Sequence, residues 1–337
     1  MKKRVVTFGE IMLRLAPEGY MRFLQADSFG AVYGGGEANV AVSLAQFGYD
    51  AAFVTKLPEH DIGQAAVNHL RRYGVDTSKI VRGGDRVGIY YLERGASLRP
   101  SRVIYDRAGS AFALAKAEEF DWDKIFAGAD WFHISGITPA LGEELVKAAL
   151  DAAAAAKRHG LVVSCDVNYR AKLWGAHEAG RVIGQILGLA DVYIGGRGQE
   201  DALFGIKTDL RSEDDYTAYE AAAKELMERF SLKTVAMTLR TTLSSDRNKF
   251  AALIYDGKSF EFSREYDINI VDRVGGGDSF AAGLIYGALE GMSTKETVEF
   301  AAAASCLKLT VEGDCSIASA NEVRQLAFGS GSAQVQR

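Results

Sequence analysis

Short runs rich in apolar and β-branched residues alternate along the chain with longer stretches in which apolar residues recur at helical spacing. The short runs predict strands at residues 5–8, 51–56, 131–134, 161–167, 192–194 and 234–239. The periodic stretches between them predict helices at residues 37–47, 62–73, 143–158 and 216–230. This alternation is typical of an α/β fold, in which a mostly parallel central sheet is flanked by helices on both faces.

Two regions interrupt the alternation. Residues 14–33 hold several aromatic residues without a helical period, and residues 88–94 and 102–107 have the pattern of two strands joined by a polar loop. Because no helix follows these strands, we expect a small β-strand lid from about residues 12–34 and 88–108, although an ordinary sheet edge explains the pattern equally well. A further hairpin is predicted where residues 250–256 and 259–266 flank a two-residue turn, Asp256-Gly257.

Length, charge and cysteine content narrow the class of protein. The 337 residues fit one large domain, which we expect at residues 1–328, followed by a disordered tail at 329–337. The net charge of -5 without a basic run argues against a nucleic-acid partner, and no apolar stretch is long enough to predict a membrane span. The three cysteines are isolated from one another, which is typical of a reducing compartment, so we expect a cytoplasmic protein.

The strongest chemical signal is a run of three glycines, Gly275, Gly276 and Gly277, directly before Asp278 and an apolar helix. Successive glycine N–H groups can turn toward an anion, and the helix N-terminus adds a positive dipole, so this loop predicts a site that stabilises a transferring phosphoryl group. Asp278 in the first helical turn is placed to accept a proton from a substrate hydroxyl. A plain glycine loop capped by Asp278 is the structural alternative.

A second glycine run, Gly34-Gly35-Gly36, precedes the first predicted helix, where Asn39 could bind sugar hydroxyls; a tight turn at a packed helix start is the alternative. The chain lacks both a Gly-x-Gly-x-x-Gly fingerprint after its first strand and a Gly-x-x-x-x-Gly-Lys-Ser/Thr loop. These absences argue against a dinucleotide-binding domain and against a P-loop enzyme.

Taken together, the two glycine runs resemble the signatures of the PfkB family of carbohydrate kinases, a resemblance that extends to about Ala327. The C-terminal signature usually reads Asp-Thr-x-Gly-Ala-Gly-Asp, and here Arg273 replaces the Thr and Gly276 the Ala. The resemblance implies a ribokinase-like fold and ATP-dependent phosphorylation, with Asp278 as the base and Gly275, Gly276 and Gly277 as the anion hole.

Within that family the chain is most similar to 2-keto-3-deoxygluconate kinases, on the strength of residues 8–15, 34–39, 103–111, 166–170 and 272–274. That similarity implies a small sugar acid as the substrate. The residues that it implies for substrate binding, together with those of the first glycine run, are Gly34, Gly35, Asn39, Tyr90, Tyr105, Arg107 and Arg170. Arginine forks suit a substrate carboxylate because they form bidentate, charge-assisted hydrogen bonds, although surface or structural ion pairs would explain the same arginines.

The resemblance also implies ATP and Mg²⁺ as cofactors, with a monovalent cation such as K⁺ as a further candidate. For ATP binding it points to Asn168, Thr238, Arg240, Gly275 and Gly277. The family commonly carries Asn-x-x-Glu after the next strand, but here that stretch has no asparagine and Gln199 stands at the glutamate position. Glu200 is therefore the candidate metal ligand.

Two other functions remain open at this point. One is a PfkB kinase for a neutral sugar such as fructose or ribose, which the arginine pair disfavours. The other is a non-catalytic sugar- or nucleotide-binding protein, which the intact Asp278 disfavours. The exposed strands of the predicted lid also lead us to expect a homo-oligomer.

Overall fold

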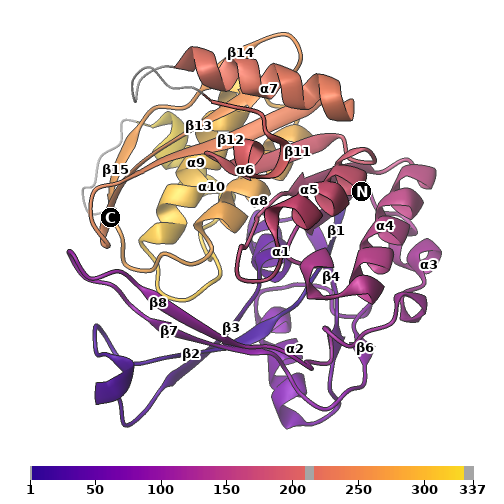
Figure 1. The fold of residues 1–337 in the computed structure, drawn as a ribbon, viewed down its shortest axis with the longest axis vertical. Helices are drawn as coiled ribbons and strands as arrows, with labels where there is room; N and C mark the ends of the chain where they lie inside the picture. The colour runs from indigo at the N-terminus through magenta and orange to yellow at the C-terminus, as the bar shows by residue number, and fades with distance from the viewer. Residues whose placement is uncertain (1, 209–215, 330–337) are drawn as a thin grey trace.

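The computed structural model describes residues 2–208 and 216–329, and a nine-stranded sheet runs through its centre (Figure 1). The strand order is β14-β13-β12-β11-β10-β9-β1-β4, and β15 also pairs with β13. The strands from β4 to β12 in this order are parallel, whereas β13, β14 and β15 add antiparallel pairs at one side. The bounds are β1 Arg4–Phe8, β4 Asp50–Val54, β9 Trp131–Ser135, β10 Val162–Asp166, β11 Val192–Gly196, β12 Thr234–Thr242, β13 Arg247–Tyr255, β14 Phe260–Phe262 and β15 Tyr266–Asn269.

Helices cover both faces of this sheet and enclose two apolar cores. One core contains side chains of α1, α2, α8, α9 and α10, and the other contains side chains of α3, α4, α5 and α7. Such two-sided burial explains why the parallel strands read as nearly continuous apolar runs. The bounds are α1 Gly36–Gln46, α2 Asp61–Arg72, α3 Trp122–Phe126, α4 Glu143–Arg158, α5 Ala176–Leu187, α6 Gln199–Phe204, α7 Tyr216–Phe230, α8 Gly276–Leu289, α9 Thr294–Leu309 and α10 Ala320–Phe328.

A separate four-stranded sheet, which we call the lid sheet, projects from the main body at the lower left of Figure 1. Its order is β3-β2-β7-β8, so it joins residues from both regions that interrupted the strand–helix alternation. The sequence pattern left a sheet edge as an alternative, and the separate sheet excludes it. The bounds are β2 Met12–Ala16, β3 Gly30–Gly34, β7 Ile89–Glu93 and β8 Arg102–Asp106, and the remaining short elements are β5 Lys56–Leu57, β6 Val81–Arg82, η1 Phe23–Gln25, η2 Ala117–Glu119 and η3 Pro139–Leu141.

The hairpin predicted near Asp256 forms, but its details differ from the expectation. Tyr255 pairs with Phe260, so four residues rather than two connect the strands. The Asp256 carboxylate accepts hydrogen bonds from the backbone N–H groups of Lys258 and Ser259, at 2.8 and 2.9 Å, which stabilises this wider turn. The predicted strand at 259–266 is divided into β14 and β15. Most of the tail expected at 329–337 lies outside the described residues.

Candidate active site

A cavity of about 640 Å³ lies where the lid sheet faces the carboxyl ends of β10, β11 and β12 and the first turns of α1 and α8. Open α/β sheets bind ligands at this edge, and the volume is in the range of small-molecule sites. The cavity brings together every predicted site residue except Glu200: Gly34, Gly35, Asn39, Tyr90, Tyr105, Arg107, Asn168, Arg170, Thr238, Arg240, Gly275, Gly276, Gly277 and Asp278.

The glycine loop before α8 has a backbone that only glycine accommodates at Gly275, and its role as an anion site stays a prediction. Gly275 has a left-handed φ of 86°, and a Cβ there would lie 1.9 Å from the backbone oxygen of Asp314, so this position requires glycine. A Cβ on Gly277 would meet nothing within 4 Å, which leaves open space beside the helix start. The first intrahelical bond runs from Ser279 N to Gly275 O at 2.9 Å, so the preceding N–H groups have no helical acceptor.

Asp278 lies in the first turn of α8, half-buried at the cavity wall. Its Oδ2 accepts a hydrogen bond of 2.7 Å from Nδ2 of Asn39. Burial raises the pKa of Asp278 to about 6, against the opposing effect of the Asn39 donor, and the nearby Glu37 carboxylate also raises it. A carboxylate with a pKa close to neutral is well matched to act as a general base.

Asn39 uses both ends of its side-chain amide within the protein. Its Oδ1 accepts from the backbone N of Gly35 and from Sγ of Cys315, each at 3.3 Å, while Nδ2 donates to Asp278. The sequence suggested that Asn39 binds sugar hydroxyls, whereas its observed contacts orient the carboxylate of Asp278. The two residues are 239 positions apart, so the sequence alone gives no signal for this contact.

Two residues predicted to bind the substrate already have strong protein partners. Nε of Arg107 donates to the Glu10 carboxylate at 2.8 Å, its Nη2 binds the same oxygen, and both side chains are buried. The hydroxyl of Tyr90 donates to the carboxylate of Asp314. The guanidinium of Arg107 lies 5.8 Å from the ring centroid of Tyr105, in cation–π geometry. The structure therefore gives Arg107 and Tyr90 a structural role as well, and their contact with substrate stays a prediction.

Three arginines at the cavity form no ion pair within the described part of the chain. Among the described residues, no carboxylate forms an ion pair with Arg170, Arg240 or Arg273, and the hydrogen bonds found for Arg170 and Arg273 go to backbone oxygens. Burial lowers the pKa of Arg240, and the like charges of Arg273 and Arg170 lower it further. The charge of Arg170 still lowers the pKa of the Asp166 and Asp278 carboxylates, so these groups interact without a direct ion pair. Arginines that are not held in a direct ion pair can bind anions such as phosphate or carboxylate. Arg273 was missed as a site residue because it appeared only as a substitution in the C-terminal signature.

The candidate metal ligand Glu200 is misplaced for that role. Its side chain is fully buried, its Oε1 accepts from Gly198 N and Thr208 Oγ1 at 3.1 and 2.8 Å, and it does not line the cavity. The preceding residue, Gln199, lines the cavity instead, because consecutive residues of α6 point in directions about 100° apart. Burial and these hydrogen bonds disfavour Glu200 as a metal ligand, and its role stays an untested prediction.

Asp166, at the end of β10, is a better candidate for the metal-binding side of the site, and sequence reasoning gave it no role. It lines the cavity with Asn168, and burial together with the Asp278 charge raises the pKa of Asp166 to about 7. No cluster of three or more acidic, His or Cys side chains suited to a metal occurs among residues 2–208 and 216–329. Mg²⁺ is commonly held by one or two carboxylates, waters and substrate phosphates, so Asp166 with Asn168 and Gln199 fits such a site.

A glycine-rich helix start open to the cavity, a carboxylate with a raised pKa and a lid sheet beside them are the features expected of a phosphotransferase site. Residues 2–321 match the pfkB family carbohydrate kinases, and the chain belongs to that family.

Individual relatives agree with this assignment. The chain is 50% identical to the 2-dehydro-3-deoxygluconokinase of Thermotoga maritima, whose crystal structure it matches with a TM-score of 0.94 over 97% of this chain and 100% of that one. It is 32% identical to the 2-dehydro-3-deoxygalactonokinase of Haloferax volcanii over 100% of both chains. A putative ribokinase II from E. coli, in a structure with ATP and Mg²⁺, is 20% identical with a TM-score of 0.81 and covers 96% and 98% of the two chains. The predicted ribokinase-like fold is thus confirmed.

Proposed function

We propose that the protein transfers the γ-phosphoryl group of ATP to 2-keto-3-deoxygluconate, giving ADP and 2-keto-3-deoxy-6-phosphogluconate. The similarity to a 2-dehydro-3-deoxygluconokinase over nearly the whole chain supports this substrate. The observation that carries the proposal is the position of Asp278, a carboxylate with a pKa of about 6 in the first turn of α8, in a cavity with three arginines that form no direct ion pair with a described carboxylate.

In the proposed reaction, Asp278 accepts the proton of the C6 hydroxyl as that oxygen attacks the γ-phosphorus. The bond from the γ-phosphorus to the β,γ-bridging oxygen breaks, and ADP leaves with that electron pair. The N–H groups around Gly275, Gly276 and Gly277 stabilise the negative charge on the phosphoryl oxygens, with Arg240 and Arg273 nearby. The open space beside Gly277 supports this role of the glycine loop, and Arg240 and Arg273 line the same cavity without an ion pair to a described carboxylate.

For the sugar acid, we infer that Arg170 is the principal ligand of the carboxylate. It is exposed at the cavity and has no acidic partner among the described side chains, whereas Arg107 is already neutralised by Glu10. Arg107 still has Nη1 available for a second hydrogen bond, because its two contacts with Glu10 use Nε and Nη2. Gly34, Gly35, Tyr90 and Tyr105 complete the proposed sugar-binding wall.

ATP and Mg²⁺ are the proposed cofactors, with Asn168 and Thr238 contributing to the ATP side. Asp166, Asn168 and Gln199 would hold Mg²⁺ through its waters, and the ion would neutralise charge on the ATP phosphates. Asp166 is suited to this because a cation favours its ionised form, which burial and Asp278 disfavour.

A second candidate substrate is the C4 epimer, 2-keto-3-deoxygalactonate. The observation that favours it is the 32% identity to a 2-dehydro-3-deoxygalactonokinase along the full length of both chains. The arginines at the cavity suit either epimer, since the two share the carboxylate and the C6 hydroxyl. Neutral sugars lack the carboxylate and so would leave the charge of Arg170 unmatched.

We further propose that the lid sheet closes over bound sugar and that it pairs with a second copy of the chain. Side chains exposed on it and its connections include Leu24, Leu98 and Ile104, at 99%, 95% and 48% exposure. Exposed apolar residues in one region are typical of an interface.

In the described part of the chain no helix is long and apolar enough to cross a membrane. The three cysteines are buried free thiols, which supports the proposed cytoplasmic location.

The test of the proposed function is a comparison of ADP release with both keto-deoxy acids, fructose and ribose at saturating Mg·ATP. We expect kcat/KM for at least one acid to exceed that for either neutral sugar by about tenfold or more, since an arginine–carboxylate hydrogen bond contributes roughly 1.5–3 kcal/mol. Equal or higher kcat/KM on a neutral sugar would contradict the proposal.

A further inference from the structure

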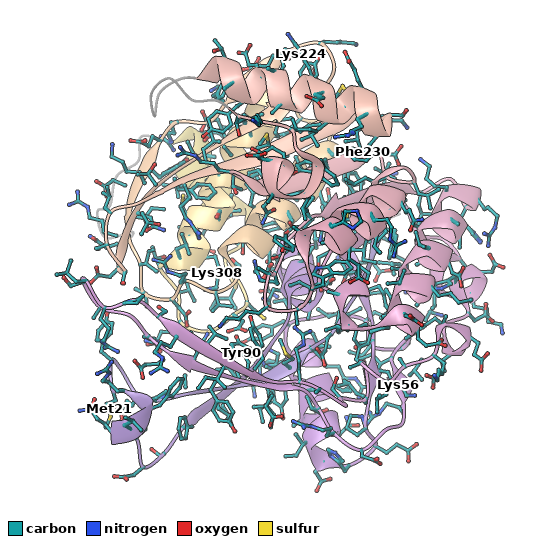
Figure 2. The ribbon with its side chains drawn as sticks, viewed as in Figure 1. Met21, Lys56, Tyr90, Lys224, Phe230 and Lys308 are labelled. Carbon is teal, nitrogen blue, oxygen red and sulfur yellow. The ribbon has the colours of Figure 1, made fainter. Side chains whose placement is uncertain are left out.

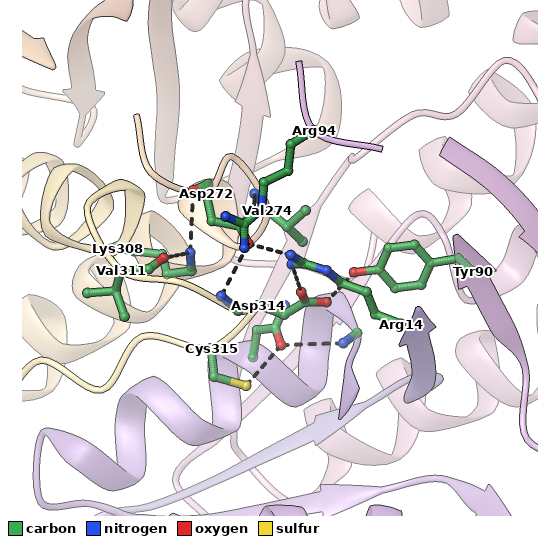
Figure 3. Close-up of polar contacts among 12 residues, drawn as sticks. Arg14, Tyr90, Arg94, Asp272, Val274, Lys308, Val311, Asp314 and Cys315 are labelled. Carbon is green, nitrogen blue, oxygen red and sulfur yellow. Dashed lines mark hydrogen bonds and ion pairs between the residues drawn. The ribbon is translucent and has the colours of Figure 1, made fainter. Parts of the chain in front are cut away.

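Lys308, in the last turn of α9, is fully buried, and the proposed reaction assigns it no role. Figure 2 shows it at the end of α9, toward the lid sheet that carries Tyr90. Its Nζ donates to the backbone oxygens of Val311 at 3.1 Å and Asp272 at 3.5 Å (Figure 3). Burying an ammonium group is costly unless oxygen atoms and opposite charge replace its water. The surroundings of Lys308 therefore explain why it is tolerated.

The opposite charge comes from two buried carboxylates, Asp272 and Asp314. Both form ion pairs with the guanidinium of Arg14, at 2.5 and 2.6 Å, so a single arginine of the lid sheet neutralises only part of the charge of the two carboxylates. At the rim, Arg94 lies 3.9 Å from Asp272 but pairs more closely with Glu312, at 2.9 Å. Lys308 supplies the remaining positive charge: burial lowers its pKa, and Asp272 and Asp314 act in the opposite direction.

The same lysine lies directly behind the anion hole. A Cβ built on Gly275, the N-cap of α8, would be 3.0 Å from Cε of Lys308. The segment before this glycine is bound to the end of α9, because Val271 N donates to Leu309 O at 2.8 Å. The ammonium of Lys308 thus joins two segments, the one that leads into the glycine loop and the one that carries Asp314.

Backbone carbonyl oxygens around a buried ammonium are the ligands that a dehydrated potassium ion would take. We propose that Lys308 is a positioning residue for phosphoryl transfer, which holds the glycine loop from behind and supplies there the positive charge that a bound monovalent cation would otherwise supply. This inference rests on the anion hole of the proposed function. It leads to the conclusion that the reaction needs no K⁺, although the sequence left K⁺ as a candidate cofactor.

The first test uses the unmodified enzyme. Turnover is measured with Mg·ATP in tetramethylammonium, sodium, potassium and ammonium chloride at equal ionic strength, and ADP is quantified directly so that no coupling enzyme responds to the cation. We expect kcat to change by less than about twofold among the four salts. Activation by K⁺ of about tenfold or more would overturn the proposal.

The second test removes the charge in two ways. Lys308→Ala leaves a space lined by the freed carbonyls, and we expect kcat to fall about tenfold or more, with KM for the sugar acid changed less than threefold; a directly donating group contributes about 10²–10³-fold. Ammonium ions should restore part of this loss, whereas the larger tetramethylammonium should not. Lys308→Met keeps the stem and fills the space, so ammonium should not rescue it. Lys295→Ala, at an exposed position of the same helix, is the control and should keep normal kcat.

A normal kcat in Lys308→Ala, or a loss accompanied by a lower Tm that ammonium does not restore, would assign the residue a purely structural role and overturn the proposal. If the variants fail to fold, the salt comparison on the unmodified enzyme still decides. Failure of the proposed function is distinguished by Asp278→Asn: full activity in that variant would refute Asp278 as the base, and with it the proposed function. A large loss of kcat would uphold the base, so that a negative result for Lys308 would then overturn the lysine proposal alone.

Discussion

The hydrogen bond from Asn39 to Asp278 makes a prediction about the pH dependence of catalysis. Nδ2 of Asn39 lies 2.7 Å from Oδ2 of Asp278 and favours the ionised carboxylate. Asn39→Ala removes this donor, so the pKa of Asp278 must rise. A hydrogen bond to a charged group contributes roughly 1.5–3 kcal/mol, and one pKa unit corresponds to about 1.36 kcal/mol. Because Asp278 is half-buried, we take the lower end and expect a rise of about one unit.

The rate depends on the deprotonated base, so kcat/KM rises with pH through the pKa of Asp278, which is about 6 in the intact protein. In Asn39→Ala the acidic limb of the profile should move to about pH 7. At pH 6 the ionised fraction would fall from about one half to about one tenth, a roughly fivefold loss that disappears above pH 8.

The assay is kcat/KM for the sugar acid at saturating Mg·ATP between pH 5 and pH 9. Ser43→Ala is the matched control, because the Ser43 hydroxyl donates to the backbone oxygen of Asn39, at 2.9 Å, and contacts neither its side chain nor Asp278 among the described hydrogen bonds. That variant should keep the acidic limb near pH 6. A pH-independent rise in KM for Asn39→Ala, with an unmoved limb, would refute the orienting role and favour direct contact with sugar hydroxyls.

Three further predictions concern the walls of the cavity. Amide exchange in β7 and β8 should slow when sugar acid is added, because the lid sheet closes over it; unchanged exchange at saturating ligand would argue against a lid. The double variant Glu10→Gln with Arg107→Met removes a buried ion pair without leaving one charge unpaired. We expect it to raise KM for the sugar acid by about tenfold and KM for neutral sugars less. Equal increases in both KM values would exclude Arg107 as a carboxylate ligand. Arg240→Met should raise KM for ATP by about tenfold with little change in KM for the sugar, because a charged hydrogen bond to phosphate contributes roughly 1.5–3 kcal/mol. A KM for ATP that stays within twofold of the wild-type value would exclude Arg240 from the ATP site.

Local patterns in the sequence were sufficient for the fold and for the glycine loops. The helix boundaries 143–158 and 216–230 agree with α4 and α7 because periodic apolar faces define them directly. The helix that follows the glycine run also agrees with expectation, since an apolar helix was predicted directly after Gly275, Gly276 and Gly277.

The long-range contacts within the site could not be predicted in the same way. Asn39 with Asp278 and Glu10 with Arg107 are joined only by the packing of distant elements. The sequence also could not show which of two neighbouring residues faces the cavity. At the start of α6 the side chain of Gln199 lines the cavity, whereas that of Glu200, one position later, is buried in the protein. The burial of Lys308 could not be predicted from the sequence either, because lysine side chains are usually exposed at the protein surface.

The most direct test of Asp278 as the base in phosphorylation of a sugar acid is turnover by Asp278→Asn on 2-keto-3-deoxygluconate at saturating Mg·ATP. Calorimetric titration of the same variant reports whether both substrates still bind. We expect kcat to fall by about 10²–10⁴-fold, with dissociation constants for the sugar acid and for ATP changed little, because a positioned general base acts on the transition state. Near-normal turnover by a variant that binds both substrates would contradict the account.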